Sequence, residues 1–194
     1  MFPGDPDPES DLIARARSGD PDAFAELVGA HADRVYAALR RFGLDGGEAE
    51  DVAQEVFVRA WRGLASFQER AQLSTWLYRI AFNEAQRRLS RRGPPLAERD
   101  SEGESSVEAI AEASNLGPEA RALDSEFEAV LERALSELPV EWRAAVVLRD
   151  IEGLSTEDAS AVVGVRQAAF KSRLHRGRMR LRSLLEPYLG FEAG

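Results

Sequence analysis

The sequence predicts an all-α fold class, with two small helical domains joined by a flexible acidic linker. Apolar residues recur near the helical period of 3.6 along most of the chain, and no run alternates with period two for long enough to indicate a strand. Residues 93–117 are rich in acids, proline and glycine and poor in large apolar side chains, which is typical of a linker. With 194 residues, 44% of them hydrophobic, the chain can form two packed cores.

The first domain is expected over residues 11–92, after a flexible N-terminus of residues 1–10. Asp20-Pro21 is an N-cap followed by proline at the first helical position, and the helix that begins there stops at Gly43. A second amphipathic helix is expected over about residues 47–63. Its apolar stripe consists of Val52, Val56 and Ala60.

A third helix is expected over about residues 74–92, after a loop over residues 66–73. The apolar pattern predicts that this helix buries Trp76, Leu77, Ile80 and Ala81. Trp76 is assigned to the core rather than to a binding surface because it shares a stripe with Ile80. The helix becomes basic towards its end.

The second domain is expected over residues 118–186, before a tail of residues 187–194. Helical periodicity resumes at Pro118 and again at Pro139, and both prolines suit a helix start. Ser155, with Asp158 three residues later, then forms a start like a capping box for a short helix. Gly164 and Val165 form a tight turn into a long basic helix over about residues 166–185. A small core is expected from Leu154, Ala159, Val162, Val163, Val165, Phe170 and Leu174.

The last two helices match the helix-turn-helix plan, whose second helix enters the major groove of DNA. Arg166 and Gln167 stand at the start of that helix, where side chains reach base edges. The side chains that better suit phosphates are Lys171, Ser172, Arg173 and Arg176. A helical hairpin with a basic face is the alternative structure for this pattern.

The net charge of −9 is unevenly distributed, and its distribution changes what it implies about nucleic acid. Residues 93–137 hold 12 acids and three bases, so the net charge of this segment equals that of the whole chain. Residues 166–182 hold seven bases and no acid, a cationic stripe of the kind that phosphate contacts require. The alternative is an ordinary solvated helix face.

Catalysis and metal binding are not expected from this sequence. There is no cysteine, the two histidines His31 and His175 lie in different domains, and no phosphate-binding glycine loop or nucleophile elbow is present. No catalytic residue, metal site or cofactor is therefore predicted. The start of the chain lacks the pattern of a signal peptide, and no apolar run is long enough for membrane insertion, so a cytoplasmic protein is expected.

Two stretches carry a resemblance to a known family. The segment LSTEDASAVVGVRQAAFKSRLHRGRMRLRSLL resembles region four of extracytoplasmic-function bacterial sigma factors of the sigma-70 family. The segment DGGEAEDVAQEVFVRAWRGLASFQERAQLSTWLYRIAFNEAQRRLSRR resembles their region two. Both occur in the order and separation found in that family.

The resemblance implies that core RNA polymerase is the partner of both domains. In the family the second helix of region two docks on the clamp helices of the largest polymerase subunit, and region four meets the flap. The polar face of the corresponding helix offers Glu50, Asp51, Gln54 and Glu55 to arginines of the partner. Without the resemblance, this face reads equally well as a solvated surface.

The resemblance also implies that the next loop and helix read and melt the minus-ten element of promoter DNA. The residues expected to do so are Phe67, Gln68, Arg79, Asn83, Arg87 and Arg88. They combine a cationic track with polar side chains that suit unstacked single-stranded bases. The helix-turn-helix residues Arg166, Gln167, Lys171, Ser172, Arg173 and Arg176 are expected at the minus-thirty-five element.

The sequence departs from the family pattern at three places. Arg87 stands where the family usually has aspartate, Ala159-Ser160 replaces an isoleucine-alanine pair, and Ala168-Ala169-Phe170 replaces glycine-threonine-valine. The last change lies at the front of the recognition helix, so no family minus-thirty-five consensus is transferred to this chain.

The expected function is that of a sigma factor, which directs promoter-specific transcription initiation and has no enzymatic activity. Family members are commonly controlled by an anti-sigma factor, and such a partner is expected here. Two alternatives are a helix-turn-helix regulator that acts without polymerase and a helical adaptor that binds only protein. The region-two stretch favours the sigma factor, because a DNA-binding regulator needs no clamp-binding helix.

Overall fold

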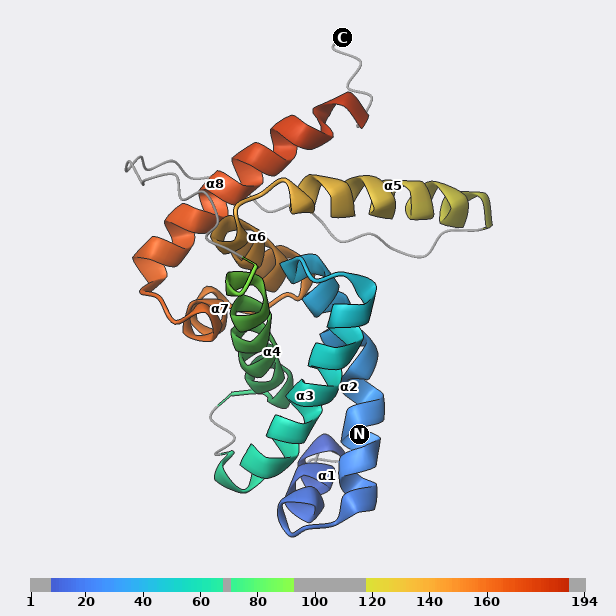
Figure 1. Ribbon diagram of the computed structural model, residues 1–194, viewed down its shortest axis with the longest axis vertical. Coiled ribbons are helices and arrows are strands. Elements are labelled where there is room, and N and C mark those ends of the chain that lie inside the picture. Colours follow the sequence, from blue (N-terminus) through green and yellow to red (C-terminus); the bar gives the residue numbers. More distant parts are fainter. Residues whose placement is uncertain (1–7, 68–70, 93–117, 189–194) are drawn as a thin grey trace, which may run out of the picture. The chain divides into compact units, whose positions relative to one another are not determined.

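The computed structural model describes residues 8–67, 71–92 and 118–188, and all of their regular structure is helical (Figure 1). The chain separates into two compact units, Met1–Arg92 and Gly93–Gly194. The all-α prediction is therefore confirmed for the described residues. The segment expected to be the linker, residues 93–117, lies outside them.

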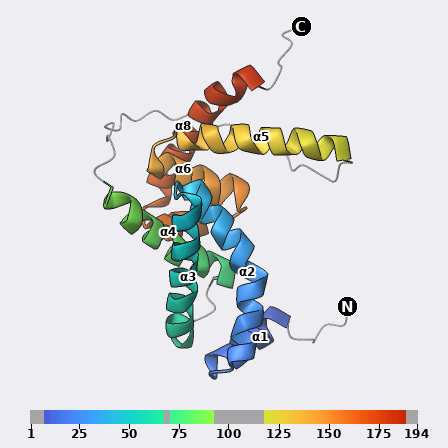
Figure 2. The same ribbon diagram turned by 45° about the vertical axis from the view of Figure 1, so that its right-hand side comes forward.

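The described residues of the first unit form four α-helices. They are α1 (Pro8–Arg17), α2 (Pro21–Phe42), α3 (Gly46–Gly63) and α4 (Leu73–Ser90), with the short 3-10 helix η1 (Leu64–Ser66) after α3. Helix α2 packs against the other three, and α3 packs on α4 (Figures 1 and 2). The interior is formed by Val35, Leu39 and Phe42 from α2, Val52 and Val56 from α3, and Leu77, Tyr78 and Phe82 from α4.

The starts of α2 and α3 are fixed by capping side chains, of which the sequence analysis predicted Asp20. Asp20 accepts hydrogen bonds from the backbone N–H groups of Asp22 at 3.0 Å and Ala23 at 3.2 Å. Asp45 and Glu48 form a reciprocal capping box at the start of α3. These caps satisfy N–H groups that have no partner inside the helix, and so they set the points at which each helix begins.

The expected burial of α4 was partly wrong. Leu77 and Ala81 are buried, but Trp76 and Ile80 are only half-buried. The core side of α4 also contains Tyr78 and Phe82, which are 1% and 2% exposed. Two apolar stripes run along this helix, and the bulkier one containing Tyr78 and Phe82 faces α2, where Phe82 packs edge-on against Phe42.

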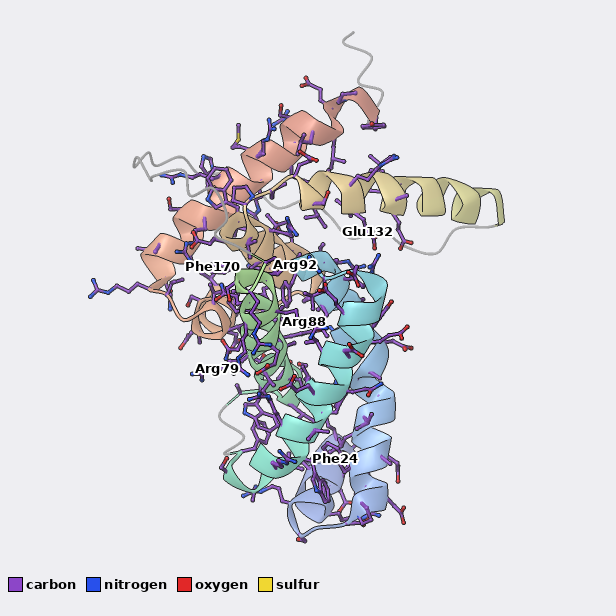
Figure 3. The ribbon with its side chains drawn as sticks, viewed as in Figure 1. Phe24, Arg79, Arg88, Arg92, Glu132 and Phe170 are labelled. Atoms are coloured by element: carbon purple, nitrogen blue, oxygen red, sulfur yellow. The ribbon has the colours of Figure 1, made fainter. Side chains whose placement is uncertain are left out.

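The second unit is also a helical assembly. Its elements are α5 (Pro118–Ser136), α6 (Val140–Val146), the π-helical turn η2 (Val147–Ile151), α7 (Thr156–Val163), α8 (Gln167–Leu185) and the 3-10 helix η3 (Glu186–Tyr188). Helix α8 packs against α5, α6 and α7. Phe170, near the start of α8, is fully buried (Figure 3).

The helix-turn-helix core is largely as expected. Leu154, Ala159, Val162, Phe170 and Leu174 are buried. Val163 and Val165, which flank the turn, are only half-buried. Between them Gly164 adopts a φ of 75°, a left-handed conformation that glycine reaches without strain, and this ends α7 and redirects the chain into α8.

Candidate nucleic-acid interface

The acidic face of α3 points away from the core of the first unit. Ala49, Val52, Val56 and Ala60 are buried on one side of the helix. The four residues expected to contact polymerase are all exposed, namely Glu50, Asp51, Gln54 and Glu55. This arrangement follows from the 3.6-residue period, which turns the polar positions outward once the apolar stripe is buried.

The outward face of α4 carries three of the residues expected to contact minus-ten DNA. Arg79, Asn83 and Arg87 are exposed, and helical spacing places them on one side with the half-buried Trp76 and Ile80. Arg88 is half-buried and points towards α3 (Figure 3). The face is therefore cationic and partly aromatic, a combination found where proteins hold single-stranded nucleic acid.

Phe67 lies differently from what its expected role in DNA contact requires. Its side chain is only 6% exposed, and its ring lies 5.1 Å from the ring of Trp76, measured between centroids. Trp76 also lies against Gly63, where a Cβ atom would stand 3.2 Å from the indole. In this structure Phe67 therefore packs against the ring of Trp76 instead of being free to contact DNA. Gln68, the neighbouring candidate, lies outside the described residues.

Ion pairs connect the acidic face of α3 to the basic end of α4. Arg88 Nη2 lies 3.3 Å from Asp51 Oδ2, and Arg88 Nε lies 3.6 Å from Glu48 Oε1. Arg92 pairs with Glu48 and with Asp45, the latter at 3.4 Å. Residues that the sequence assigned to two different partners, polymerase and DNA, are thus in contact with each other.

Glu84 is a member of the site that sequence reasoning missed. Its carboxylate is only 5% exposed and contacts arginines of two helices, Arg59 of α3 at 3.1 Å and Arg87 of α4 at 3.2 Å. Arg59 in turn donates two hydrogen bonds to Glu55, at 2.7 and 3.2 Å. The i, i+3 spacing to Arg87 was a possible signal, but the burial depends on Arg59, which is 25 positions earlier in the chain.

The cluster around Arg59 shifts two titration equilibria. Hydrogen bonds from Arg59 hold the pKa of the Glu55 carboxyl below its ordinary value, and the same bonds raise the pKa of Arg59. Both groups remain charged near neutral pH. Ion pairs thus connect Glu55 to Arg59, Arg59 to Glu84 and Glu84 to Arg87, so acidic and basic side chains alternate along the series.

Among the residues expected to contact minus-thirty-five DNA, the exposed ones stand at the N-terminal end of the recognition helix α8. Arg166, Gln167 and Lys171 are exposed, and so are Ala168 and Ala169. The remaining candidates Ser172, Arg173 and Arg176 are half-buried. The residues best placed to reach a base edge or a phosphate are thus the first ones of the helix, as in the helix-turn-helix plan.

Two arginines of the cationic stripe of α8 are paired with acidic side chains of the same unit. Arg178 makes a bidentate pair with Asp150 of η2, at 2.6 and 2.9 Å, and this pairing raises the pKa of Arg178. Arg173 lies 3.4 Å from Glu141 of α6. These contacts hold α8 against the preceding elements, so part of the stripe stabilises the domain rather than facing outward.

The described residues contain no group of three or more histidines, cysteines, aspartates or glutamates arranged to hold a metal ion. In that same part of the chain, no helix combines the length and the apolar character needed to cross a membrane. Of the two histidines, His31 pairs through Nε2 with Glu9 at 2.8 Å, which joins α2 to α1.

Two family models match this chain. The model for sigma-70 region 2 matches residues 27–94, and the model for sigma-70 region 4 matches residues 128–181. The first match contains α3 and α4 with the acidic and cationic faces, and the second contains the helix-turn-helix.

Curated relatives and solved structures match over nearly the whole chain. The RNA polymerase sigma-H factor of Pseudomonas aeruginosa is 35% identical over 93% of this chain and 95% of the relative. The ECF RNA polymerase sigma-E factor of Escherichia coli K12 is 34% identical over 92% and 94%. CnrH, solved with the cytosolic domain of CnrY, matches with a TM-score of 0.65 and 29% identity over 93% of this chain and 99% of that one.

A second structure, the sigma factor RpoE of Bartonella quintana in complex with the anti-sigma factor NepR, matches with a TM-score of 0.62 and 26% identity. It covers 84% of this chain and 96% of the solved one. Both sigma-70 regions are present in this chain, and the matches extend across both helical units. The chain belongs to the extracytoplasmic-function group of the sigma-70 family.

Proposed function

We propose that this protein binds core RNA polymerase, directs it to a promoter and melts the minus-ten region, without catalytic activity of its own. The observation that carries the proposal is the presence of both sigma regions in a chain that covers 95% of the length of a sigma-H factor. A DNA-binding regulator that acts alone needs only the helix-turn-helix. The proposed place of action is the cytoplasm, where bacterial transcription occurs.

The first domain, proposed as residues 11–92, supplies the main polymerase contact. Glu50 and Gln54 face outward from α3, and Asp51 and Glu55 lie beside them. Carboxylates in this arrangement suit arginines on a helix of the partner, because guanidinium groups pair with carboxylates bidentately. The clamp helices of the largest polymerase subunit are the proposed partner, and the flap is proposed to meet the second domain.

The same domain would hold the melted minus-ten strand on α4. Arg79, Asn83, Arg87 and Arg88 provide the cations and the amide, and Trp76 provides an aromatic surface next to them. Opening a duplex costs about 1.4 kcal/mol of stacking per step, so captured bases offset only part of the cost. Phe67, which is buried against Trp76, would act by supporting that ring.

The second domain, proposed as residues 118–186, would read the minus-thirty-five element. Gln167 is suited to adenine, to which it can donate and accept at once, and Arg166 is suited to guanine. Lys171 stands one turn later and suits a phosphate. Residues 93–117 are proposed as the linker that allows the two domains to reach their separate DNA elements.

An anti-sigma factor is proposed as the regulator of this protein. RpoE of Bartonella quintana was solved with its anti-sigma factor NepR, and it matches this chain over 96% of its own length. Since an anti-sigma factor must block polymerase, DNA or both, the exposed faces of α3, α4 and α8 are the surfaces that it would cover.

Transcription in vitro tests the proposal directly. Core polymerase would be given a library of promoters, with and without the protein, and transcripts would be sequenced. We expect initiation from a defined subset of promoters only when the protein is present. Initiation that does not change would overturn the sigma assignment. Binding to duplex DNA with no effect on polymerase would favour a regulator that acts alone.

A further inference from the structure

Glu84 is a buried carboxylate that the proposed function does not yet use. It lies on α4 with 5% of its side chain exposed, and it divides its two oxygens between two arginines. Oε1 lies 3.1 Å from Nε of Arg59, and Oε2 lies 3.2 Å from Nη1 of Arg87. A carboxylate leaves water at a high cost unless it is paired in this way, so its place inside the helix pair requires these contacts.

Arg87 is the exposed partner of this carboxylate. Its side chain is 48% exposed, and it stands on the outward face of α4 with Arg79 and Asn83. The contact to Glu84 involves Nη1, whereas a guanidinium has five N–H donors in a fixed fork. Arg87 can therefore stay on Glu84 and still direct other donors to a phosphate or a base.

Arg59 is shared between Glu55 and Glu84, and its contact to Glu84 means that the buried carboxylate divides its charge between two arginines. Arg59 comes from α3 and supplies Glu84 with a second positive partner, so Arg87 is not the sole counter-ion of the buried carboxylate. A side chain that is held in its bound geometry also loses less conformational entropy when it meets its ligand. The arrangement thus favours an oriented arginine that still attracts an anion.

We propose that Glu84 is a positioning residue, which orients the guanidinium of Arg87 for contact with the melted minus-ten strand. The inference rests on the proposed function, because it takes promoter DNA as the ligand of Arg87. The proposal also explains the departure from the family pattern at position 87. The arginine there has a glutamate three residues earlier on the same helix, at a spacing that lets the two side chains pair.

A double-mutant cycle tests this assignment. Holoenzyme would be assembled from core polymerase and the full chain carrying Glu84→Gln, Arg87→Ala or both. Dissociation constants would be measured for a promoter that the wild-type holoenzyme selects. We expect Arg87→Ala to weaken DNA binding about tenfold and Glu84→Gln about fivefold, with the double variant no weaker than Arg87→Ala alone, because contacting residues are not additive.

Two results would overturn the proposal. If the losses multiply, Glu84 acts only by joining α3 to α4. If Glu84→Gln binds DNA more tightly, the carboxylate competes with DNA for Arg87 instead of positioning it. Glu26→Gln, which removes one exposed carboxylate from α2, controls for a general change in charge. A wild-type holoenzyme that selects no promoter would instead count against the proposed function.

A second variant keeps the test decisive if Glu84→Gln does not fold. Arg87→Lys retains the charge at an exposed position but replaces the oriented fork by a flexible ammonium. We expect it to bind promoter DNA about threefold more weakly with the same dependence on salt, since the number of charges is unchanged. Affinity equal to that of the wild type would show that orientation at this position is irrelevant and would overturn the proposal.

Discussion

Arg88 of α4 and Asp51 of α3 form an ion pair, with 3.3 Å between Nη2 and Oδ2, that joins the face expected to bind DNA to the face expected to bind polymerase. Both side chains are accessible, at 37% and 71% of their surface. Accessible pairs are weak and exchange readily for other charged partners. An arginine of polymerase at Asp51 would replace this pair and leave Arg88 with Glu48 as its remaining acidic partner, and a phosphate at Arg88 would release Asp51 in the same way.

Asp51→Asn should therefore have opposite effects on the two partners. Affinity for core polymerase should fall, because a carboxylate is lost from the docking face. Affinity of the free protein for a labelled single-stranded oligonucleotide at low salt should rise about twofold to fivefold, because Arg88 loses a competing anion. Fluorescence anisotropy measures the second effect.

Glu50→Gln is the comparison for this experiment. Glu50 belongs to the same exposed face of α3, but its contacts in the described structure do not include Arg88. Glu50→Gln should weaken binding to polymerase without increasing the affinity for the oligonucleotide. If Asp51→Asn and Glu50→Gln change oligonucleotide binding equally, the effect is one of net charge, and the Asp51–Arg88 pair has no part in it.

Gln167→Ala should relax the base preference of the minus-thirty-five element at one position. Gln167 is exposed at the start of α8, and its amide can pair bidentately with adenine. The loss of binding free energy should be about 1–3 kcal/mol for DNA with the preferred base and much smaller for DNA with another base at that position. Selection from a randomised minus-thirty-five library with mutant holoenzyme measures this preference.

Lys171→Ala is the matched contrast, since Lys171 is exposed on the same helix and suits a phosphate. This substitution should weaken binding to all DNA sequences by a similar factor, and it should reduce the salt dependence of binding by about one unit of slope. A sequence-dependent loss for Lys171→Ala, with a uniform loss for Gln167→Ala, would reverse the two assignments.

The elements with local signals could be predicted from the sequence. Asp20 and Ser155 cap α2 and α7, and Gly164 ends α7, each through contacts within a few residues. Such contacts depend only on the local chain, so the residue types reveal them. The exposed acidic face of α3 was predictable for the same reason, because burial of one stripe turns the opposite one outward.

Features that depend on contacts between helices could not be predicted in this way. Trp76 and Ile80 form an apolar stripe as regular as that of the true core, and only the packing of Phe82 on Phe42 shows which stripe faces inward. Glu84 drew no prediction from the sequence, because its burial depends on Arg59 from α3. Arg178 was counted in the cationic stripe of residues 166–182, although Asp150 pairs with it.

Glu55 should contribute to stability in a pH-dependent way. The pKa of its carboxyl is lowered in the folded protein, chiefly by hydrogen bonds from Arg59. A carboxyl of this kind stabilises the fold above its unfolded pKa, near the ordinary value of 4.5, and the contribution disappears as pH falls through the folded pKa. The group is largely exposed, so the effect is small.

Glu55→Gln removes this titrating group while keeping the size of the side chain. The variant should be less stable than the wild type at about pH 6, and the difference should shrink towards about pH 3, as the wild-type carboxyl is progressively protonated in the folded protein. Thermal unfolding followed by circular dichroism measures both values. A difference that stays constant between the two pH values would show that Arg59 does not stabilise the ionised carboxylate.

Gly177→Ala should destabilise the second domain although alanine favours helices. Gly177 lies on α8 where it crosses α6, and a Cβ there would stand 2.8 Å from Val146 Cγ2 and 3.0 Å from the Trp142 carbonyl oxygen. The backbone oxygen cannot move aside as a flexible side chain can. Overpacking of this kind costs about 1–3 kcal/mol, which exceeds the gain of up to about 1 kcal/mol in helix propensity.

Gly29→Ala provides the opposite case within the same protein. Gly29 lies inside α2, and a Cβ at this position meets no atom within 4 Å. Only the propensity term remains, so this variant should stabilise the first domain by up to about 1 kcal/mol. Hydrogen exchange on both variants assigns each change to its domain. Because the two substitutions are chemically identical, a stabilising Gly177→Ala would mean that α6 and α8 do not approach as closely as the structure shows.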